Sequence, residues 1–262
     1  MIKAMRTAAT GMIAQQMNVD NIANNLANVN TTGFKKSSVE FQDVLYQNIR
    51  QAGSASSIGT QVPVGLSIGY GTKPVATHRQ FTEGDLTGTG NPLDMAISGD
   101  GFFQVQYPDG STVYTRDGAF KMSADGTVVT SEGYMLLPQI TIPEDATSIS
   151  IGSDGTVEVL QTGTDVPTQI GQIELARFIN PSGLNAIGHN LLAQTGASGD
   201  PVTDVPTQSG LGSIDQGYLE MSNVDVVDEM VNMIVAQRAY EMNSKAIQTA
   251  DDMAQLANSL KR

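Results

Sequence analysis

The chain has 262 residues and 40% of them are hydrophobic, so it is long enough for a buried core and too apolar for a disordered protein. It contains no cysteine, which excludes disulfides and thiolate metal sites. Its net charge is −13, and residues 51–219 carry seventeen acidic but only five basic side chains, so neither nucleic acid nor an anionic membrane is an expected partner.

The first predicted element is a long amphipathic helix over residues 1–31. Met5, Met12, Val19 and Leu26 recur every seven residues. The companion positions are held by Ile2, Ala9, Gln16 and Ala23, so Gln16 is the one polar break. Such spacing is typical of a helix that packs along a partner helix. We expect this helix to end near Thr31 and Thr32, with Gly33 as its left-handed cap.

This helix is not expected to be stable alone. Burying its five larger apolar residues contributes about 8–15 kcal/mol. Ordering the backbone of some thirty residues costs on the order of 30–60 kcal/mol, which helical hydrogen bonds offset only in part. The helix therefore needs the C-terminal helix, other copies of the chain, or both.

Six asparagines at positions 18, 21, 24, 25, 28 and 30 are unusual, because asparagine is a poor helix former. Amide side chains pair with one another and with backbone at crowded helix interfaces. We therefore assign Asn24, Asn25 and Asn28 to a subunit interface. The alternative is a solvated polar face.

The next two segments differ in character. Ser37 and Glu40 have the spacing of a capping box, and apolar residues follow at helical spacing, so a short helix is predicted over 38–50. Residues 51–72 are small, polar and glycine-rich, which predicts an extended arm and not part of the core.

From residue 73 to about 217 the hydrophobic period changes to two, which predicts a mostly antiparallel β domain. The predicted strands cover 96–97, 102–106, 113–114, 127–129, 149–151, 157–159 and 170–178. Asp-Gly pairs favour tight hairpins, and they occur at 100–101, 109–110, 117–118, 125–126 and 154–155. Residues 180–216 are expected to be irregular.

A second long helix is predicted over 224–260, opening at Ser222 and Asn223 with acidic residues in its first turns. Its hydrophobic residues repeat at steps of three to five, and we assign the larger ones to the subunit interface: Val227, Val231, Ile234, Met242, Met253 and Leu260. The predicted fold class is α+β, with the two terminal helices forming a coiled-coil-like domain. The predicted segments are 1–50 and 220–262 for that domain, 51–72 for the arm and 73–219 for the β domain.

Motifs for chemistry are weak. Ser67 lies in a G-x-S-x-G match, but prolines on both sides prevent the strand–turn–helix that a nucleophile needs. His78 and His189 are the only histidines and cannot supply a typical zinc site. We expect no catalytic site, no metal and no cofactor, and we expect no membrane insertion, because no stretch approaches the roughly 20 apolar residues of a membrane span.

Residues 23–35 (ANNLANVNTTGFK) resemble the N-terminal motif of the bacterial flagellar rod and hook axial proteins, and residues 222–245 resemble the second motif of that family. The resemblance continues through residues 63–71, 74–77, 101–105, 114–118 and 216–220. Within the family, residues 63–71 are most similar to the members that build the distal rod.

The resemblance implies a structural subunit of the flagellar basal body that assembles into a tubular helical polymer. The terminal helices would line a channel for exported subunits, and the polymer would transmit torque across the periplasm. The implied partners are further copies of the chain, the proximal rod proteins, the hook protein and the surrounding P and L ring proteins. The implied export route is the flagellar type III apparatus, which agrees with the absence of a cleavable signal sequence near Lys3 and Arg6.

Three alternatives remain at this point. A proximal rod or hook protein belongs to the same family. A secreted β-rich hydrolase would use Ser67 with a histidine in reach. A monomeric binding module would pair its two end helices within one chain.

Overall fold

The computed structural model describes residues 2–52, 55–57, 60–61, 63–163 and 166–259. The chain forms two compact units: unit 1 comprises Met1–Leu26, Ser37–His78 and Asp225–Arg262, and unit 2 comprises Ala27–Lys36 and Arg79–Val224. Unit 1 carries eight basic and nine acidic residues, whereas unit 2 carries six and eighteen, so nearly all the net charge belongs to unit 2. None of the helices in the described ranges is long and apolar enough to cross a membrane.

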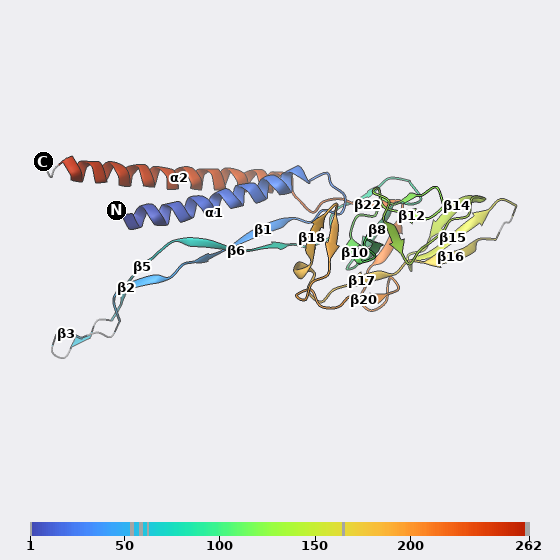
Figure 1. Ribbon diagram of the computed structural model, residues 1–262, viewed down its shortest axis with the longest axis horizontal. Coiled ribbons are helices and arrows are strands. Elements are labelled where there is room, and N and C mark those ends of the chain that lie inside the picture. The colour runs from blue at the N-terminus through green and yellow to red at the C-terminus, as the bar shows by residue number, and fades with distance from the viewer. Residues whose placement is uncertain (1, 53–54, 58–59, 62, 164–165, 260–262) are drawn as a thin grey trace. The chain divides into compact units, whose positions relative to one another are not determined.

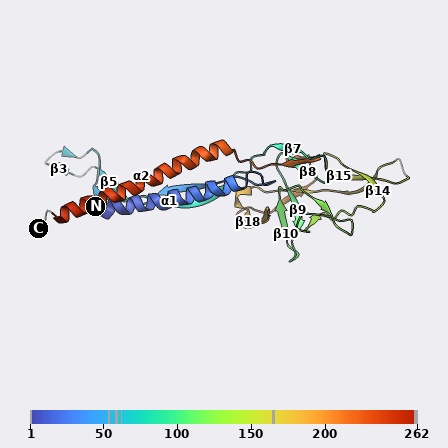
Figure 2. The same cartoon turned by 90° about the horizontal axis from the view of Figure 1, so that it is seen from above.

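Two long helices form one part of unit 1, and they lie side by side in both views (Figures 1 and 2). They are α1 (Ile2–Ala27) and α2 (Val226–Ser259). Asp225 caps α2, because its Oδ1 accepts hydrogen bonds from the backbone nitrogens of Val227 at 2.7 Å and Asp228 at 3.2 Å. The helix therefore begins later in the chain than the start predicted at Ser222 and Asn223.

The first helix ends earlier than predicted. α1 stops at Ala27, and a turn follows in which the nitrogen of Thr31 donates to the carbonyl oxygen of Asn28 at 3.1 Å. Gly33 does adopt the left-handed conformation, with φ +67°, but it lies beyond the helix and does not cap it.

The rest of unit 1 is a β-ribbon, so the helix predicted over 38–50 is wrong. Strand β1 (Ser37–Asp43) pairs with β6 (Thr72–Arg79), β2 (Tyr46–Arg50) with β5 (Leu66–Gly69), and β3 (Ala55–Ser57) with β4 (Thr60–Gln61). Ser37 and Glu40 form no capping box: the Ser37 hydroxyl bonds Asn21, and the Glu40 carboxylate lies 3.0 Å from Nδ1 of His78 on β6. The hydrophobic residues of this stretch satisfy both a helical and an extended pattern, and pairing with β6 and β5 decides between them.

Unit 2 is built from short strands. They are β7 (Leu86–Gly88), β8 (Met95–Ser98), β9 (Phe102–Gln106), β10 (Thr112–Thr115), β11 (Lys121–Met122), β12 (Val128–Val129), β13 (Met135–Leu137), β14 (Ala146–Ile151), β15 (Thr156–Gln161), β16 (Thr168–Gln172), β17 (Leu175–Arg177), β18 (Asn185–Gly188), β19 (Leu191–Ala193), β20 (Val202–Asp204), β21 (Ser213–Gln216) and β22 (Tyr218–Glu220), with one 3₁₀ turn, η1 (Pro181–Gly183). The largest sheet has nine strands in the order β11-β12-β13-β9-β10-β19-β18, with β17 beside β9 and β20 beside β17. Smaller sheets are β14-β15-β16, β21-β8 and β22-β7.

Strand β9 is the centre of this unit, because it pairs antiparallel with β10, β13 and β17. Its successive side chains point to opposite faces of the sheet. Phe103 packs edge-on against Phe120 in the largest buried cluster, with ring centroids 5.2 Å apart. Phe102 packs on the other side with Phe178, at 5.9 Å. The sheet is therefore covered by hydrophobic clusters on both faces.

The sequence located most of the first half of this unit. Strands β8, β9, β10, β12, β14 and β15 confirm the predicted strands, and the stretch 170–178 divides into β16 and β17. The irregular stretch predicted over 180–216 is wrong, since β18, β19, β20 and β21 lie there. Of the Asp-Gly pairs, those at 109–110, 125–126 and 154–155 join paired strands, whereas 100–101 and 117–118 link strands that pair elsewhere.

Candidate assembly interface

The two helices of unit 1 come close at two positions that fit one antiparallel register. A β-carbon on Gly11 would lie only 2.8 Å from Nδ2 of Asn243. Further along, Nδ2 of Asn25 lies 3.2 Å from the Glu229 carboxylate. Moving 14 residues forward on α1 corresponds to moving 14 residues back on α2, so both contacts fit the same antiparallel register. Four alanines of the two helices are buried: Ala8 and Ala14 on α1, and Ala236 and Ala250 on α2.

Asn25 of α1 forms hydrogen bonds with two other segments of unit 1, the start of β1 and the first turn of α2. Its side chain is 1% exposed, and its amide nitrogen donates to the Ser37 carbonyl oxygen at 2.8 Å as well as to Glu229. Its amide oxygen accepts from the backbone nitrogen of Ser37 at 3.0 Å. Asn21 donates to the same Ser37 carbonyl at 2.7 Å. These two asparagines therefore attach the start of β1 to α1 within one chain.

The side of α2 that faces away from its buried residues carries an apolar stripe. The buried residues Glu229, Ala236 and Ala250 recur at multiples of seven along one side of the helix. On the other side, at 100° per residue, steps of three or four residues line up a set that we call the outer stripe: Val227, Val231, Ile234, Arg238 and Met242. Each of its four hydrophobic side chains is more than half exposed, and Met242 reaches 71%. A monomeric protein rarely leaves such a set uncovered.

The other predicted interface residues are less uniform. Met253 is also about half exposed. Met5, Met12, Val19 and Leu26 are partly buried along α1. Asn24 is exposed, and Asn28 accepts a hydrogen bond from the Thr31 hydroxyl at 3.2 Å. The side chain of Ile2 and the whole of Leu260 lie outside the described residues.

Several exposed hydrophobic residues escaped the sequence reasoning. Ile13 and Met17 lie outside the sevenfold series of α1, yet they are 58% and 46% exposed. Their spacing of four residues was the available signal. Val235 and Leu256 extend the apolar exposure of α2.

A groove lies in unit 1 between α1 and the β1–β6 pair, and we call it the α1–β6 groove. Its volume is 450 Å³, and it is lined by Met17, Asp20, Asn21, Val39, Pro74, Val75, Ala76 and Thr77. Its one ionisable lining residue is Asp20, which is exposed. The groove is therefore largely apolar, with a single negative charge.

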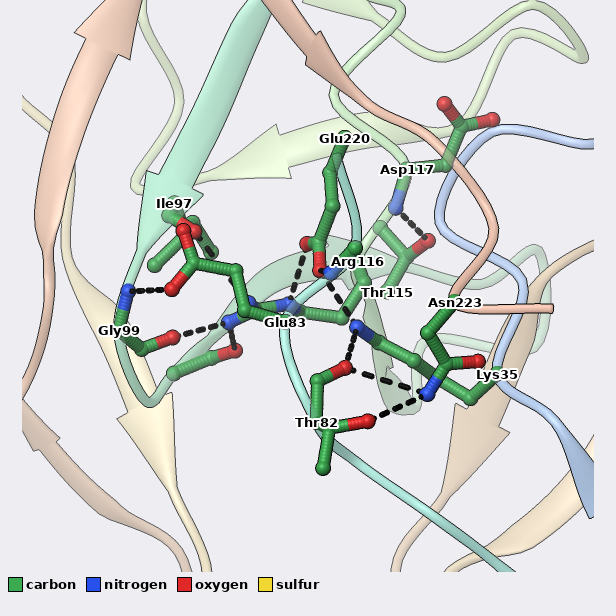
Figure 3. Close-up of polar contacts among 12 residues, drawn as sticks. Lys35, Thr82, Glu83, Ile97, Gly99, Thr115, Arg116, Asp117, Glu220 and Asn223 are labelled. Atoms are coloured by element: carbon green, nitrogen blue, oxygen red, sulfur yellow. Dashed lines mark hydrogen bonds and ion pairs between the residues drawn. The ribbon is translucent and has the colours of Figure 1, made fainter. Parts of the chain in front are cut away.

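Unit 2 contains a buried group of three charges (Figure 3). The Glu220 carboxylate lies 2.5 Å from Nζ of Lys35 and 2.8 Å from Nε of Arg116, and all three residues are at most 6% exposed. Arg116 also donates to the carbonyl oxygens of Gly99 at 2.8 Å and Gly101 at 2.7 Å. Lys35 donates to the carbonyl oxygen of Thr82 at 2.6 Å. These hydrogen bonds compensate the burial of the charges.

The pKa values of this group follow from burial and from one another. Burial lowers the pKa of Lys35 below 10.5, although the Glu220 carboxylate opposes the shift. Burial alone would raise the pKa of Glu220, but the positive charges of Arg116 and Lys35 outweigh it and hold that pKa below its ordinary value. Glu220 is thus kept ionised in the folded protein.

Comparison with known proteins identifies the family. Three family models match: "Flagella basal body rod protein" over residues 5–35, "Flagellar hook protein FlgE/F/G D1 domain" over 96–159, and "Flagellar basal body rod FlgEFG protein C-terminal" over 215–260. The chain is 52% identical to the flagellar basal-body rod protein FlgG of Borreliella burgdorferi, over the full length of both chains. It is 49% identical to the FlgG of Caulobacter vibrioides, over 99% of this chain and all of the relative, and 41% identical to the FlgG of Bacillus subtilis, over the full length of both.

The chain belongs to the flagellar basal-body rod protein family. It is accordingly a structural protein of the basal body and not an enzyme. The first matched range covers α1 and the segment after it, and the last runs from β21 through α2, so the family match includes both helices of unit 1.

Membership of the rod family leaves the chemical motifs without a catalytic role. Ser67 lies within strand β5 opposite Asn48, and not on a turn before a helix. His78 contacts Ser38 and Glu40, and His189 contacts Glu132. In the described part of the chain, no three His, Asp or Glu side chains are grouped so that they could hold a metal ion.

Proposed function

We propose that this protein is the subunit of the distal flagellar rod and that copies of it assemble into a rigid tubular helical polymer. The proposal is supported by the full-length similarity to proteins named flagellar basal-body rod protein FlgG. Residues 63–71, which resemble the distal rod members of the family, favour the distal part of the rod over its proximal part or the hook.

Unit 1 supplies the assembly surface in this proposal. The main support for this assignment is the outer stripe of α2, whose four hydrophobic side chains are more than half exposed in a single chain. Burying each would contribute about 1.5–3 kcal/mol, so one covered stripe supplies a substantial part of a stable contact. The partly buried series of Met5, Met12, Val19 and Leu26 extends the assembly surface onto α1.

The polymer transmits motor torque to the hook and encloses the channel for exported subunits. Its neighbours are the proximal rod proteins, the hook protein and the surrounding P and L ring proteins, so the rod crosses the periplasm. The subunit reaches this position through the flagellar export apparatus.

The experiment replaces the gene in its own host. Cells that lack the gene should swim poorly and yield basal bodies without a distal rod, and the wild-type gene should restore both. The variant Ile234→Asp places a charge in the outer stripe, and Gln237→Asp places the same charge at an exposed position of α2 outside it. We expect Ile234→Asp to abolish rods and Gln237→Asp to retain them.

The purified variants must first show the helix content of the wild type, which we expect because both side chains are exposed in the single chain. Complete distal rods in cells without the gene would overturn the proposed function. Normal rods from Ile234→Asp would show that the outer stripe is not an assembly surface.

A further inference from the structure

The α1–β6 groove and the outer stripe of α2 have complementary chemistry. The groove is apolar around one carboxylate, that of Asp20, and no basic residue lines it. The stripe is apolar around one cation, since Arg238 lies one helical turn from both Ile234 and Met242. We propose that the outer stripe of one copy docks in the α1–β6 groove of the next copy, with Arg238 facing Asp20. This inference rests on the proposed function, because it specifies the contact between neighbouring subunits.

The charges on both sides are available for such a contact. Both Asp20 and Arg238 are exposed, and among the described residues neither takes part in an ion pair. The side-chain amide of Asn21, which lines the groove, already donates a hydrogen bond to the Ser37 carbonyl oxygen. The groove wall is therefore held in place within its own chain. A preformed groove with a fixed wall costs little ordering on binding.

The hydrophobic parts match as well. Met17 and Val75 line the groove and are 46% and 57% exposed, so both have apolar surface to bury. On the partner side, Val231, Ile234 and Met242 present the same kind of surface. Arg238 carries an apolar stem that can lie along the groove while its guanidinium reaches a carboxylate.

The pairing also explains a polymer in preference to a closed dimer. The groove is made by α1, β1 and β6, whereas the stripe belongs to α2, so the contact joins two different surfaces. When two copies are joined in this way, the copy that offers its groove keeps an unused stripe, and the copy that offers its stripe keeps an unused groove. Such a heterologous contact continues into an open helical filament unless its rotation closes a ring.

Engineered cysteines test the contact, because the chain contains none of its own. The double variant Met17→Cys/Ile234→Cys places one thiol in the groove and one in the stripe. Basal bodies from cells that express it are treated with a mild oxidant and run on a non-reducing gel. We expect a ladder of dimers, trimers and longer multimers, whereas each single variant should remain monomeric.

A matched pair of controls accompanies the ladder. Met17→Cys/Gln248→Cys keeps the groove thiol but moves the second thiol to an exposed position of α2 outside the stripe, and it should form no ladder. An equimolar mixture of the two single variants should give dimers and nothing longer. Rods that assemble from Met17→Cys/Ile234→Cys without any ladder would overturn the docking while leaving the proposed function intact.

Charge exchange tests the ionic part of the contact. Asp20→Arg and Arg238→Asp should each lower the amount of assembled rod about tenfold, and the double exchange should recover most of it. Lys245→Asp makes the same change in net charge on α2, seven residues beyond Arg238, and should not rescue Asp20→Arg. Rescue by Lys245→Asp equal to that by Arg238→Asp would overturn the pairing of Asp20 with Arg238. If cells without the gene build complete rods, the proposed function itself fails.

Discussion

Lys35 and Glu220 are 185 residues apart in the sequence, yet their Nζ and Oε1 atoms lie 2.5 Å apart in the interior of unit 2. Arg116 joins the same carboxylate from the end of β10 (Figure 3). The first segment of unit 2, which follows α1, and its last segment, which precedes α2, are thereby held to the same strand end.

Removing the carboxylate at the centre of this group should destabilise unit 2 strongly. Glu220→Gln leaves Lys35 and Arg116 buried without an opposite charge, and breaking such a pair typically costs about 3–5 kcal/mol. Amide hydrogen exchange of β9 and β22 reports the free energy of opening unit 2. Glu158→Gln, at an exposed position of β15, serves as the control and should stay within about 0.5 kcal/mol of wild type. Equal exchange in both variants would show that the buried charges contribute nothing to stability.

The same carboxylate should make unit 2 sensitive to acid. The folded pKa of Glu220 is lower than its ordinary value of 4.5, so the ionised group stabilises the fold above that pH. This contribution is lost as the pH falls through the folded pKa. We expect the free energy of opening to decline below pH 4.5 in wild type and to decline less steeply in Glu220→Gln. The control Glu158→Gln should keep the wild-type slope; identical slopes in all three proteins would contradict the assignment.

Gly33 should tolerate alanine less well than another glycine with almost the same backbone conformation. Gly33 and Gly90 have φ values of +67° and +71°, so alanine meets similar left-handed strain at both. A β-carbon at Gly33 would lie 2.6 Å from the backbone nitrogen of Asp117, whereas none of the described atoms lies within 4 Å of one at Gly90. Backbone cannot rotate away, so we expect Gly33→Ala to cost about 1–3 kcal/mol more than Gly90→Ala. Thermal unfolding of the two variants measures the difference. Equal losses of stability would show that the left-handed strain alone, and not the contact with Asp117, sets the cost at Gly33.

Asn25 should be important for the attachment of β1 to α1. Asn25→Ala leaves the backbone nitrogen of Ser37 and the Glu229 carboxylate without this partner, and each lost buried hydrogen bond costs about 1–3 kcal/mol. We expect faster amide exchange throughout β1. Gln16→Ala, at an exposed position of the same helix, should change it little. Unchanged exchange in Asn25→Ala would mean that β1 is held by its pairing with β6 alone.

The elements that were predictable are those whose signal lies within one segment. The sevenfold series of α1, the hydrophobic steps of three to five residues in α2 and the alternating residues of β9 specify their conformation locally. The segment 38–50 was not predictable in this way, because Phe41, Val44 and Leu45 fit both a helix and a strand. The segment contributes two strands, β1 and β2, and they depend on pairing with β6 and β5 later in the chain. Strand β19 was missed for the same reason, because it is only three residues long and two of them, Leu191 and Leu192, pair with the distant β10.

In the candidate assembly interface, too, the features visible within one segment were predictable and the contacts between distant segments were not. The exposure of Val227, Val231, Ile234 and Met242 agrees with an interface, and their contact with another copy remains a prediction. The abundance of asparagine was visible in the sequence, but the bonds of Asn25 to Ser37 and Glu229 join residues that only the fold brings together. The buried group of Lys35, Arg116 and Glu220 gave no signal at all, because its members come from three separate segments.

Gly11 offers a direct measure of how tightly the two helices pack. Glycine inside a helix is less stable than alanine by about 1 kcal/mol, so Gly11→Ala would ordinarily be stabilising. Its β-carbon, however, would lie 2.8 Å from Nδ2 and 3.2 Å from Cγ of Asn243. The amide is the end of a flexible side chain and can move aside, so the gain and the cost should nearly cancel in wild type. In an Asn243→Ala background the obstacle is gone, and we expect the full gain of about 1 kcal/mol. A double-mutant cycle on thermal unfolding measures this coupling, and equal effects of Gly11→Ala in both backgrounds would show that the helices are not in contact at this level.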